Sequence, residues 1–169
     1  WEYLLEFFPD FNYLKVKEGI DPQRIKYQRA DNLTGHQQRA FCVFWCLKCA
    51  AENGSIGIDM GCGEVIHPFC LGVDKFCGDK HPDYPDSTRT SYYHPHLVLR
   101  ADKPLPFTSD SFDFLVSSHS LEHMEDTVWS LREWIRIVKP NGILAIVMPD
   151  GKYEGIGLDS SHKTYYSSE

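Results

Sequence analysis

The chain has 169 residues, a length that suits one folded domain. Hydrophobic residues make up 42% of it and aromatic residues 14%, which is too rich in core-forming side chains for an intrinsically disordered protein. The 24 acidic residues outnumber the 17 basic ones, so the chain lacks the basic surface that nucleic acids and anionic lipids attract. No apolar run approaches the roughly 18 residues of a membrane span. We therefore expect neither a nucleic-acid substrate nor a membrane.

Six cysteines lie at positions 42, 46, 49, 62, 70 and 77. A chain of this length forms a core without disulfide bonds, so we expect reduced thiols and a cytoplasmic location.

Residues 1–53 are predicted to form an N-terminal helical segment that packs on the core. Prolines and glycines interrupt its first part, which favours short helices joined by turns. A longer helix is expected from about Gly35 to Glu52, with Thr34 as its N-cap and Asn53-Gly54 as its stop. Residues 54–169 complete what we expect to be one structural domain.

Short apolar runs alternate with polar or helical segments from position 55 onward. The strands of a parallel sheet produce such runs, because both faces of the sheet are covered. The clearest helix is predicted from about Asp126 to Val138, and the turn from Lys139 to Gly142 ends it. The expected class is α/β, a Rossmann-like, doubly wound and mostly parallel sheet in an αβα sandwich. The predicted strands are Ile56 to Met60, Cys70 to Val73, Leu97 to Leu99, Phe112 to Ser117 and Ile143 to Met148.

The first predicted strand leads into a glycine-containing turn. Asp59 ends the strand, and Gly61 and Gly63 permit a tight turn that brings backbone N–H groups close to a ligand. A nucleotide-type site at the end of a first strand has this form, and so does a plain tight turn. Ile66 replaces the third glycine of the dinucleotide fingerprint, which argues against a cofactor bound through a pyrophosphate.

The second predicted strand ends in Asp74. A carboxylate at this point accepts hydrogen bonds from both hydroxyl groups of a ribose, or it is a solvated group without a ligand. Asp74 follows Gly63 by 11 residues, about half the usual interval. With Pro68 inside it, this short interval predicts a loop in place of the helix that normally joins the two strands.

Five motifs follow one another along the chain. They read IDMGCG (58–63), GVD (72–74), ADKPLPF (101–107), SFDFLVSSHSLEH (111–123) and LREWIRIVKPNGILAIVMPD (131–150). In this combination the chain resembles the class I S-adenosylmethionine-dependent methyltransferases, in particular a methyltransferase type 11-like group with a compressed segment between GCG and GVD. The resemblance implies S-adenosylmethionine as the cofactor and S-adenosylhomocysteine as its product.

The resemblance also implies which residues hold the cofactor. Asp59 and the two glycines after it would line the methionine end, and Asp74 would hold the ribose. Asp102 would accept the adenine amino group, while Ser118 and His119 would face the cofactor and the incoming acceptor. The full implied set is Asp59, Gly61, Cys62, Gly63, Asp74, Lys75, Asp102, Lys103, Ser118 and His119.

Two features depart from the family pattern. Val65 stands where many members have a further glycine. Residues 149–169 are too few for the antiparallel sixth and seventh strands of the full fold. Either the chain is a fragment without its tail, or its sheet lacks the final strands.

Two motifs compete with this interpretation. Cys42, Cys46 and Cys49 match the CxxxCxxC spacing of radical enzymes that hold an iron–sulfur cluster, but on a helix they form one stripe typical of buried core. Residues 119–123 match the HxxEH pattern of inverted zinc peptidases, but a third ligand is not evident. We expect no metal, and we expect Glu122 to lie near the positive end of the following helix.

We therefore predict an enzyme that moves a methyl group to a small-molecule or saccharide acceptor. His119 is the first candidate for a general base, followed by His123 and His162, and Asp150 is a further polar candidate. The loop from Asp79 to His96 is expected to carry substrate selectivity or to pack on the domain edge. A non-catalytic cofactor-binding or scaffold domain of the same fold is the alternative. A zinc hydrolase that uses His119 and His123 is a third hypothesis, and the acceptor and oligomeric state stay open.

Overall fold

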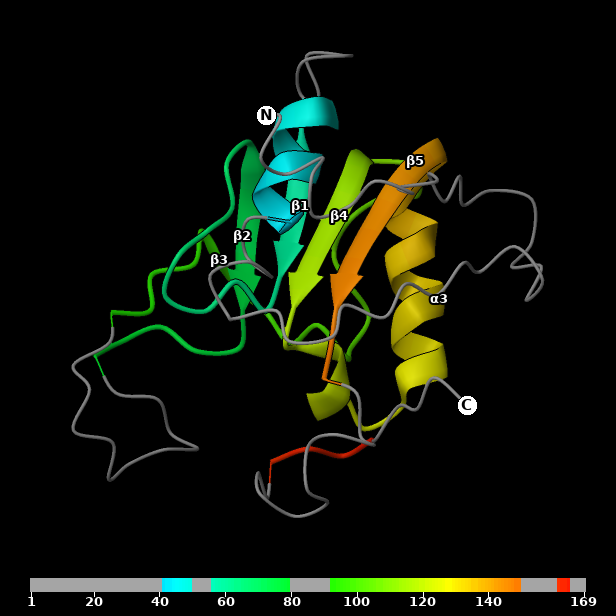
Figure 1. Ribbon diagram of the computed structural model, residues 1–169. Coiled ribbons are helices and arrows are strands. Elements are labelled where there is room, and N and C mark those ends of the chain that lie inside the picture. Colours follow the sequence, from blue (N-terminus) through cyan, green and yellow to red (C-terminus); the bar gives the residue numbers. More distant parts are fainter. Residues whose placement is uncertain (1–40, 50–55, 80–91, 150–160, 165–169) are drawn as a thin grey trace.

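The computed structural model describes residues 41–49, 56–79, 92–149 and 161–164, drawn in colour in Figure 1. They contain a five-stranded sheet in the order β3-β2-β1-β4-β5, in which each strand pairs in parallel with its neighbours. The α/β class and the parallel sheet are therefore confirmed. The elements are β1 (Gly57–Met60), β2 (Cys70–Asp74), β3 (Leu97–Val98), β4 (Phe112–Ser118), η2 (Leu121–His123), α3 (Thr127–Ile137) and β5 (Val138–Val147), with a further helix over 41–49.

The strand order changes direction at β1, which lies at the centre of the sheet. The chain passes outward from β1 to β2 and β3, and then returns to place β4 on the other side of β1. Gly57 of β1 is accordingly in register with Cys70 of β2 and with Phe114 of β4. Ligands of open α/β sheets bind at the carboxyl ends of the strands where the order reverses, so the ends of β1 and β4 define the place to look for a site.

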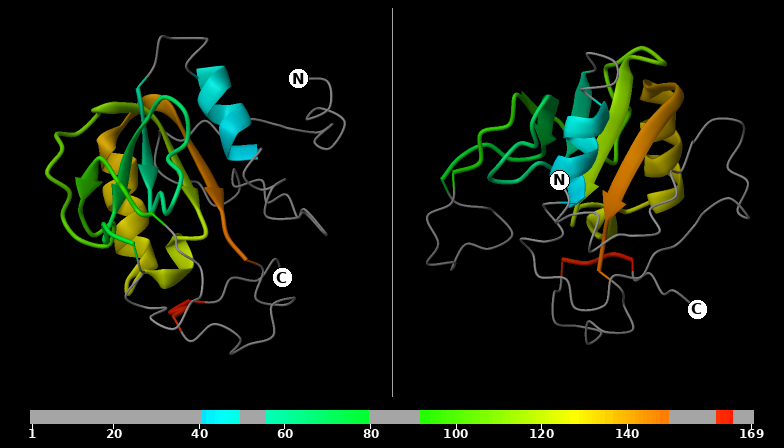
Figure 2. Two further views of the ribbon diagram at one scale, coloured as in Figure 1. Left: turned by 90° about the vertical axis from the view of Figure 1, so that its left-hand side faces the viewer. Right: turned by 45° about the horizontal axis from the view of Figure 1, so that its top comes forward.

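Helices cover both faces of the sheet, as Figure 2 shows in its left view. The helix over 41–49 packs on one face through Trp45 and three buried cysteines. On the other face, Trp134 and Ile137 of α3 are fully buried against Ile58, Leu115 and their neighbours. Burial on both faces explains why the strands read as continuous apolar runs.

The helix α3 begins at its N-cap Asp126, whose carboxylate accepts a hydrogen bond from Trp129 N at 2.9 Å. It ends at Ile137, so the predicted helix is correct to within one residue at each end. Near its end, Trp134 Nε1 donates to Ala101 O at 2.9 Å, and Arg136 Nη1 donates to Phe107 O at 2.8 Å. These bonds fasten the segment that carries Asp102 to the helix.

The strand β5 begins earlier than predicted. It starts at Val138, directly after α3, and the residues expected to form a separate turn lie within the strand. The pairing with β4 is irregular there, because Phe112 is in register with Val138 but Phe114 is already in register with Ile143. Asn141 takes a φ of 63° in this irregular stretch. The Lys-Pro-Asn-Gly sequence thus makes a bulge within the strand.

No helix joins β1 to β2, and the predicted loop over 61–69 is confirmed. The side chain of Ile66 lies over Gly72, in the space that a Cβ atom at position 72 would need. Ile66, which stands in place of the third glycine of the dinucleotide fingerprint, therefore helps to cover the sheet where the usual helix is absent.

Several sequence predictions fall outside the described residues. These are the short helices before position 34, both ends of the helix expected over 35–52, residues 80–91 of the loop, and Asp150. Among the residues that the structure describes, no helix combines the length and the apolar character that a membrane span requires.

Candidate cofactor and acceptor site

Asp59 ends β1 as a fully buried carboxylate. Its Oδ2 atom accepts hydrogen bonds from His67 N at 2.9 Å and from His67 Nδ1 at 2.8 Å, so the compressed loop folds back onto it. Its Oδ1 atom has no hydrogen-bond partner among the described residues. A buried carboxylate oxygen without a donor is unfavourable, which makes Oδ1 the natural acceptor for a cationic ligand group. Sequence reasoning missed His67, because its link to Asp59 is a tertiary contact across the loop.

The glycine turn after Asp59 has the left-handed backbone that its sequence predicts. Gly61 has a φ of 71° and Gly63 a φ of 61°. A Cβ atom at position 61 would collide with Ser120 Oγ, whereas one at position 63 would meet nothing within 4 Å. The turn is therefore closed on the Gly61 side and open on the Gly63 side, where a ligand can approach the backbone.

Asp74 is buried at the end of β2 and holds the glycine turn in place. Its Oδ2 accepts from Gly63 N at 2.9 Å, and its Oδ1 accepts from Phe76 N at 3.2 Å. Each carboxylate oxygen has two lone pairs, so both oxygens keep capacity for the hydroxyl groups of a ribose. Lys75, the neighbouring residue in the implied set, is exposed.

Cys62 lies between these two acids. Burial of the thiol, with a smaller effect from the negative charges of Asp59 and Asp74, raises its pKa to about 12. The side chain therefore stays a neutral thiol at physiological pH and is not a nucleophile.

Asp102 is already paired within the chain. Arg100 donates to it through Nε at 2.9 Å and through Nη2 at 2.7 Å. These hydrogen bonds lower the pKa of Asp102, and the side chain of Arg100 is 55% exposed. The resemblance assigned Asp102 to an adenine amino group without indicating this partner. Lys103 beside it is exposed.

The end of β4 brings two implied residues to the same edge of the sheet. Ser118 is half-buried, and the preceding Ser117 donates to Met60 O at 3.0 Å, which ties β4 to β1. His119 has a φ of 53° although it is not glycine, and its side chain is 41% exposed. Residues held in this sparsely populated backbone region cluster at functional sites. His119 Nδ1 lies 3.4 Å from Glu122 Oε1.

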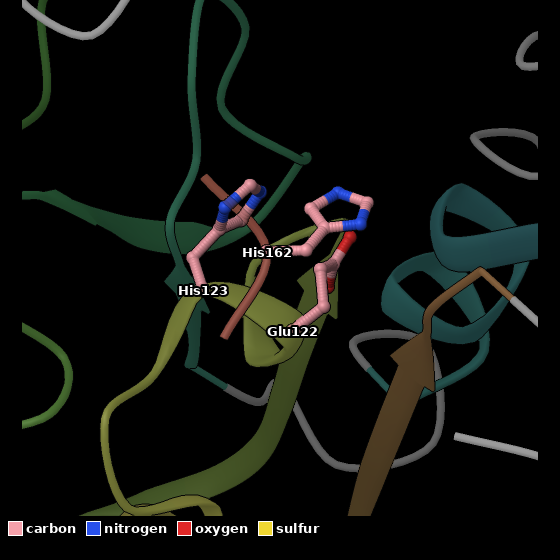
Figure 3. Close-up of side chains that lie close together, drawn as sticks. All are labelled: Glu122, His123 and His162. Carbon is pink, nitrogen blue, oxygen red and sulfur yellow. The ribbon is translucent and has the colours of Figure 1, made fainter. Parts of the chain in front are cut away.

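Glu122 comes before α3 in the chain and is the acidic residue in the first turn of the short helix η2. It is completely buried, while Asp126 caps α3. Around Glu122 the structure gathers His123 and His162, whose rings make an edge-to-face contact at 4.9 Å (Figure 3). All three sequence-predicted histidines therefore lie in one neighbourhood, with the carboxylate of Glu122 among them.

The cysteine stripe is part of the core, as predicted. Cys42, Cys46 and Cys49 are buried against the sheet, and Cys46 Sγ lies 3.7 Å from Cys70 Sγ. None of the six cysteines forms a disulfide bond. In the described part of the chain, the cysteines do not form a group with metal-binding geometry.

A sequence model described as "Methyltransferase domain" matches residues 58–146, more than half of the chain. The chain therefore belongs to the methyltransferase domain family, and S-adenosylmethionine is its cofactor. Asp59 Oδ1, which has no donor in the part of the chain that the structure describes, and the open side of the glycine turn fit the methionine end of this cofactor.

Individual relatives are more distant. The chain is 26% identical over 106 residues to the mitochondrial arginine-hydroxylase NDUFAF5 of Danio rerio, and the match covers 60% of the chain and 33% of that protein. The YcgJ protein of Bacillus subtilis is similar in structure, with 22% identity, a TM-score of 0.49 and coverage of 68% and 51%. A Thermotoga maritima S-adenosylmethionine-dependent methyltransferase, titled a possible histamine N-methyltransferase, has 20% identity, a TM-score of 0.46 and coverage of 78% and 67%. The chain spans about a third of the first of these proteins and about half of the second.

Proposed function

We propose that the chain is a catalytic methyltransferase that moves a methyl group to a small-molecule or saccharide acceptor held at the carboxyl ends of β4 and β5. The observation that carries this proposal is the buried Asp59, whose Oδ1 has no donor among the described residues and lies beside an open glycine turn. Most buried carboxylate oxygens in proteins have a hydrogen-bond donor, so this oxygen is well suited to accept one from a ligand.

Each acid at a strand end would bind a different part of the cofactor. Asp59 Oδ1 would accept from the cofactor's amino group, and the remaining lone pairs of Asp74 would accept from its ribose hydroxyls. Asp102 would accept from adenine while it keeps its bonds to Arg100. When bound, S-adenosylmethionine supplies a methyl group on a sulfonium for in-line attack, and positioning of the two reactants supplies most of the rate enhancement.

His119 is proposed as the general base for an acceptor that must lose a proton. Its exposed ring lies at the end of β4, and Glu122 lies beside its Nδ1 atom at 3.4 Å. That carboxylate would orient the ring and leave Nε2 to take the proton of the acceptor. His123 and His162, whose rings contact each other, are the next candidates for the general base.

The acceptor class is supported by charge and by exposed rings. The net charge of −7 disfavours a polyanionic substrate. Tyr92 is exposed and stacks on His94 with ring centroids 6.1 Å apart, and Phe76 makes an edge contact with Tyr93. Such rings, on the loop side of β2 and β3, are suited to packing against a sugar or another ring.

Incubation with S-adenosylmethionine that carries a labelled methyl group tests the proposal, with a panel of hydroxyl and amine acceptors. We expect label in at least one acceptor, and we expect His119→Ala to reduce the rate by about a hundredfold or more. Arg132→Ala, which changes an exposed residue of α3, serves as the control. Mass spectrometry separates addition of a methyl group from addition of oxygen, which matters because the Danio rerio relative is named a hydroxylase. Cofactor binding without any labelled product would favour the non-catalytic alternative.

A further inference from the structure

In the proposed methyl transfer, the carboxylate of Glu122 does no more than orient the ring of His119. Its side chain has no exposed surface, and neither carboxylate oxygen has a hydrogen-bond partner among the described residues. The ring of His119 approaches one of them at 3.4 Å. A carboxylate taken out of water in this way is stable only if a cation or several donors face it. A cationic ligand at this position would satisfy both carboxylate oxygens.

Two histidines supply further ligand atoms at this position. The carboxylate of Glu122 and the ring nitrogens of His123 and His162 offer three ligand atoms within 4.8 Å of one another. Figure 3 shows the three side chains gathered above η2. Nitrogen and oxygen ligands at about 2.0 to 2.2 Å from one tetrahedral ion lie about 3.4 Å apart, so the ligand atoms need to approach one another by up to about 1.4 Å. Ordinary side-chain rotation supplies a movement of this size.

The ring of His123 has a hydrogen-bond partner of the kind that orients metal-binding histidines. Its Nδ1 atom lies 3.2 Å from the backbone oxygen of Ser161 and 3.1 Å from Ser161 Oγ. Donation from Nδ1–H to that carbonyl fixes the tautomer in which Nε2 carries a free lone pair. Metal-ligating histidines usually donate their second ring N–H to a carbonyl or carboxylate in this way.

The segment that brings the third ligand is fastened to η2. Lys163 N and Thr164 N both donate to Glu122 O, at 2.7 and 3.1 Å. The hydroxyl groups of Thr127 and Thr164 lie 3.3 Å apart. The two backbone bonds directly follow His162 in the chain and hold it close to Glu122. The HxxEH motif alone offered no third ligand, and His162 provides it from 39 residues beyond His123.

We propose that Glu122, His123 and His162 bind one divalent first-row transition-metal ion. Two imidazole nitrogens and one carboxylate oxygen suit Zn²⁺ and its neighbours better than Mg²⁺, which prefers an all-oxygen shell. Three protein ligands leave at least one coordination position open to water or to an acceptor atom. His119 lies beside the carboxylate and outside the group of three. The bound ion neutralises the buried charge and holds residues 161–164 against η2. This site exists whether or not the chain transfers methyl groups.

Cobalt binding is the most direct probe, because Co²⁺ in such a site absorbs visible light. The whole chain is stripped with a chelator and titrated with Co²⁺, then with Zn²⁺ or Mg²⁺ as competitor. We expect saturation at one Co²⁺ per chain, displacement by Zn²⁺ and none by Mg²⁺. His162→Ala and Glu122→Gln should each weaken binding at least about tenfold. Glu122→Gln keeps the volume of the side chain, and circular dichroism of each variant without metal verifies folding.

His94→Ala is the matched control, because Cys77 Sγ lies 3.9 Å from His94 Nδ1 and forms the rival exposed pair of ligands. Unchanged Co²⁺ affinity in this variant supports the proposed site. Loss of binding in His94→Ala, or full affinity in both folded variants of the site, would overturn the proposal. Absence of a visible band in the wild-type chain would do the same. The titration is run without S-adenosylmethionine, so a failure of methyl transfer leaves its result unaffected.

Discussion

Ser120 and Gly61 form the tightest contact of the proposed cofactor site. The hydroxyl group of Ser120 occupies the space that a side chain at position 61 would need, and Gly61 has a φ of 71°. Gly63 shares the left-handed backbone but faces open space. The two glycines therefore separate the effect of a collision from the effect of backbone strain.

Substitution of alanine for each glycine tests this difference. Both variants should lose about 1 kcal/mol or more of unfolding free energy, because φ is positive at both positions. Gly61→Ala should lose clearly more, since the new methyl group also displaces Ser120. Urea unfolding measures both values, and Gly61→Ala in a Ser120→Gly background should recover part of the loss. Equal losses in the two single variants would contradict the packing described here.

The neutral thiol of Cys62 leads to a second prediction at this scale. Because burial raises its pKa to about 12, Cys62 should not react with iodoacetamide at neutral pH. Cys77 is the exposed cysteine and should be the one that is alkylated. Peptide mapping after brief labelling of the folded protein identifies the modified position, and Cys77→Ser should abolish the label. Labelling of Cys62 ahead of Cys77 would show that the turn is open to solvent.

Among the elements, α3 makes hydrogen bonds to the segment over 101–107. At its N-cap, the carboxylate of Asp126 accepts a hydrogen bond from Trp129 N. Removal of such a bond lowers the free energy of unfolding by about 0.5 to 2 kcal/mol. We expect Asp126→Ala to lower the unfolding free energy by that amount. Glu125→Ala, which removes the adjacent exposed carboxylate, should change it by less than about 1 kcal/mol. Equal effects in urea unfolding would argue against the cap.

The pair of Arg100 and Asp102 gives the same segment a dependence on pH. The hydrogen bonds from Arg100 lower the pKa of Asp102 below its ordinary 3.8, so the pair stabilises the folded state above that pH. The contribution is lost as pH falls through the lowered pKa of the folded state. Arg100 is largely exposed, so we expect Arg100→Met to lose less than about 1 kcal/mol at neutral pH. The difference from wild type should shrink below pH 3.8, and Arg132→Met, another exposed arginine, should show no such trend.

Strands and helices of this chain could be predicted because their buried faces produce apolar runs and periodic apolar positions in the local sequence. The starts and ends of β1 to β4 fall within one residue of the apolar runs, and α3 follows its periodic face. The start of β5 could not be predicted, because Pro140 and Gly142 read as a turn and only pairing with β4 makes them part of a bulge. The local pattern contains no information about that pairing.

At the scale of the whole molecule, the motifs predict the edge of the sheet where the site lies, but not the partners of its residues. His67 on Asp59 and His162 near Glu122 are contacts between segments that come together only in the folded chain. Arg100 lies two residues from Asp102, a spacing that does not by itself indicate a pair in a loop. The order of the strands aligns the ends of β1, β2 and β4, so the sequence could predict the site's place but not its internal bonds.

The buried Asp59 is proposed to receive the cationic amino group of the cofactor. Calorimetric titration with S-adenosylhomocysteine, which carries the same amino group, tests it most directly in the wild type and in Asp59→Asn. The amide keeps one acceptor for His67 and places a donor or a neutral oxygen at the site. Asp113→Asn is the control, since Asp113 pairs with Lys139 and lies near the amino end of β4. We expect saturable binding that weakens about tenfold to a hundredfold in Asp59→Asn and is unchanged in Asp113→Asn. No binding by the folded wild-type chain, or equal affinity in Asp59→Asn, would contradict the account.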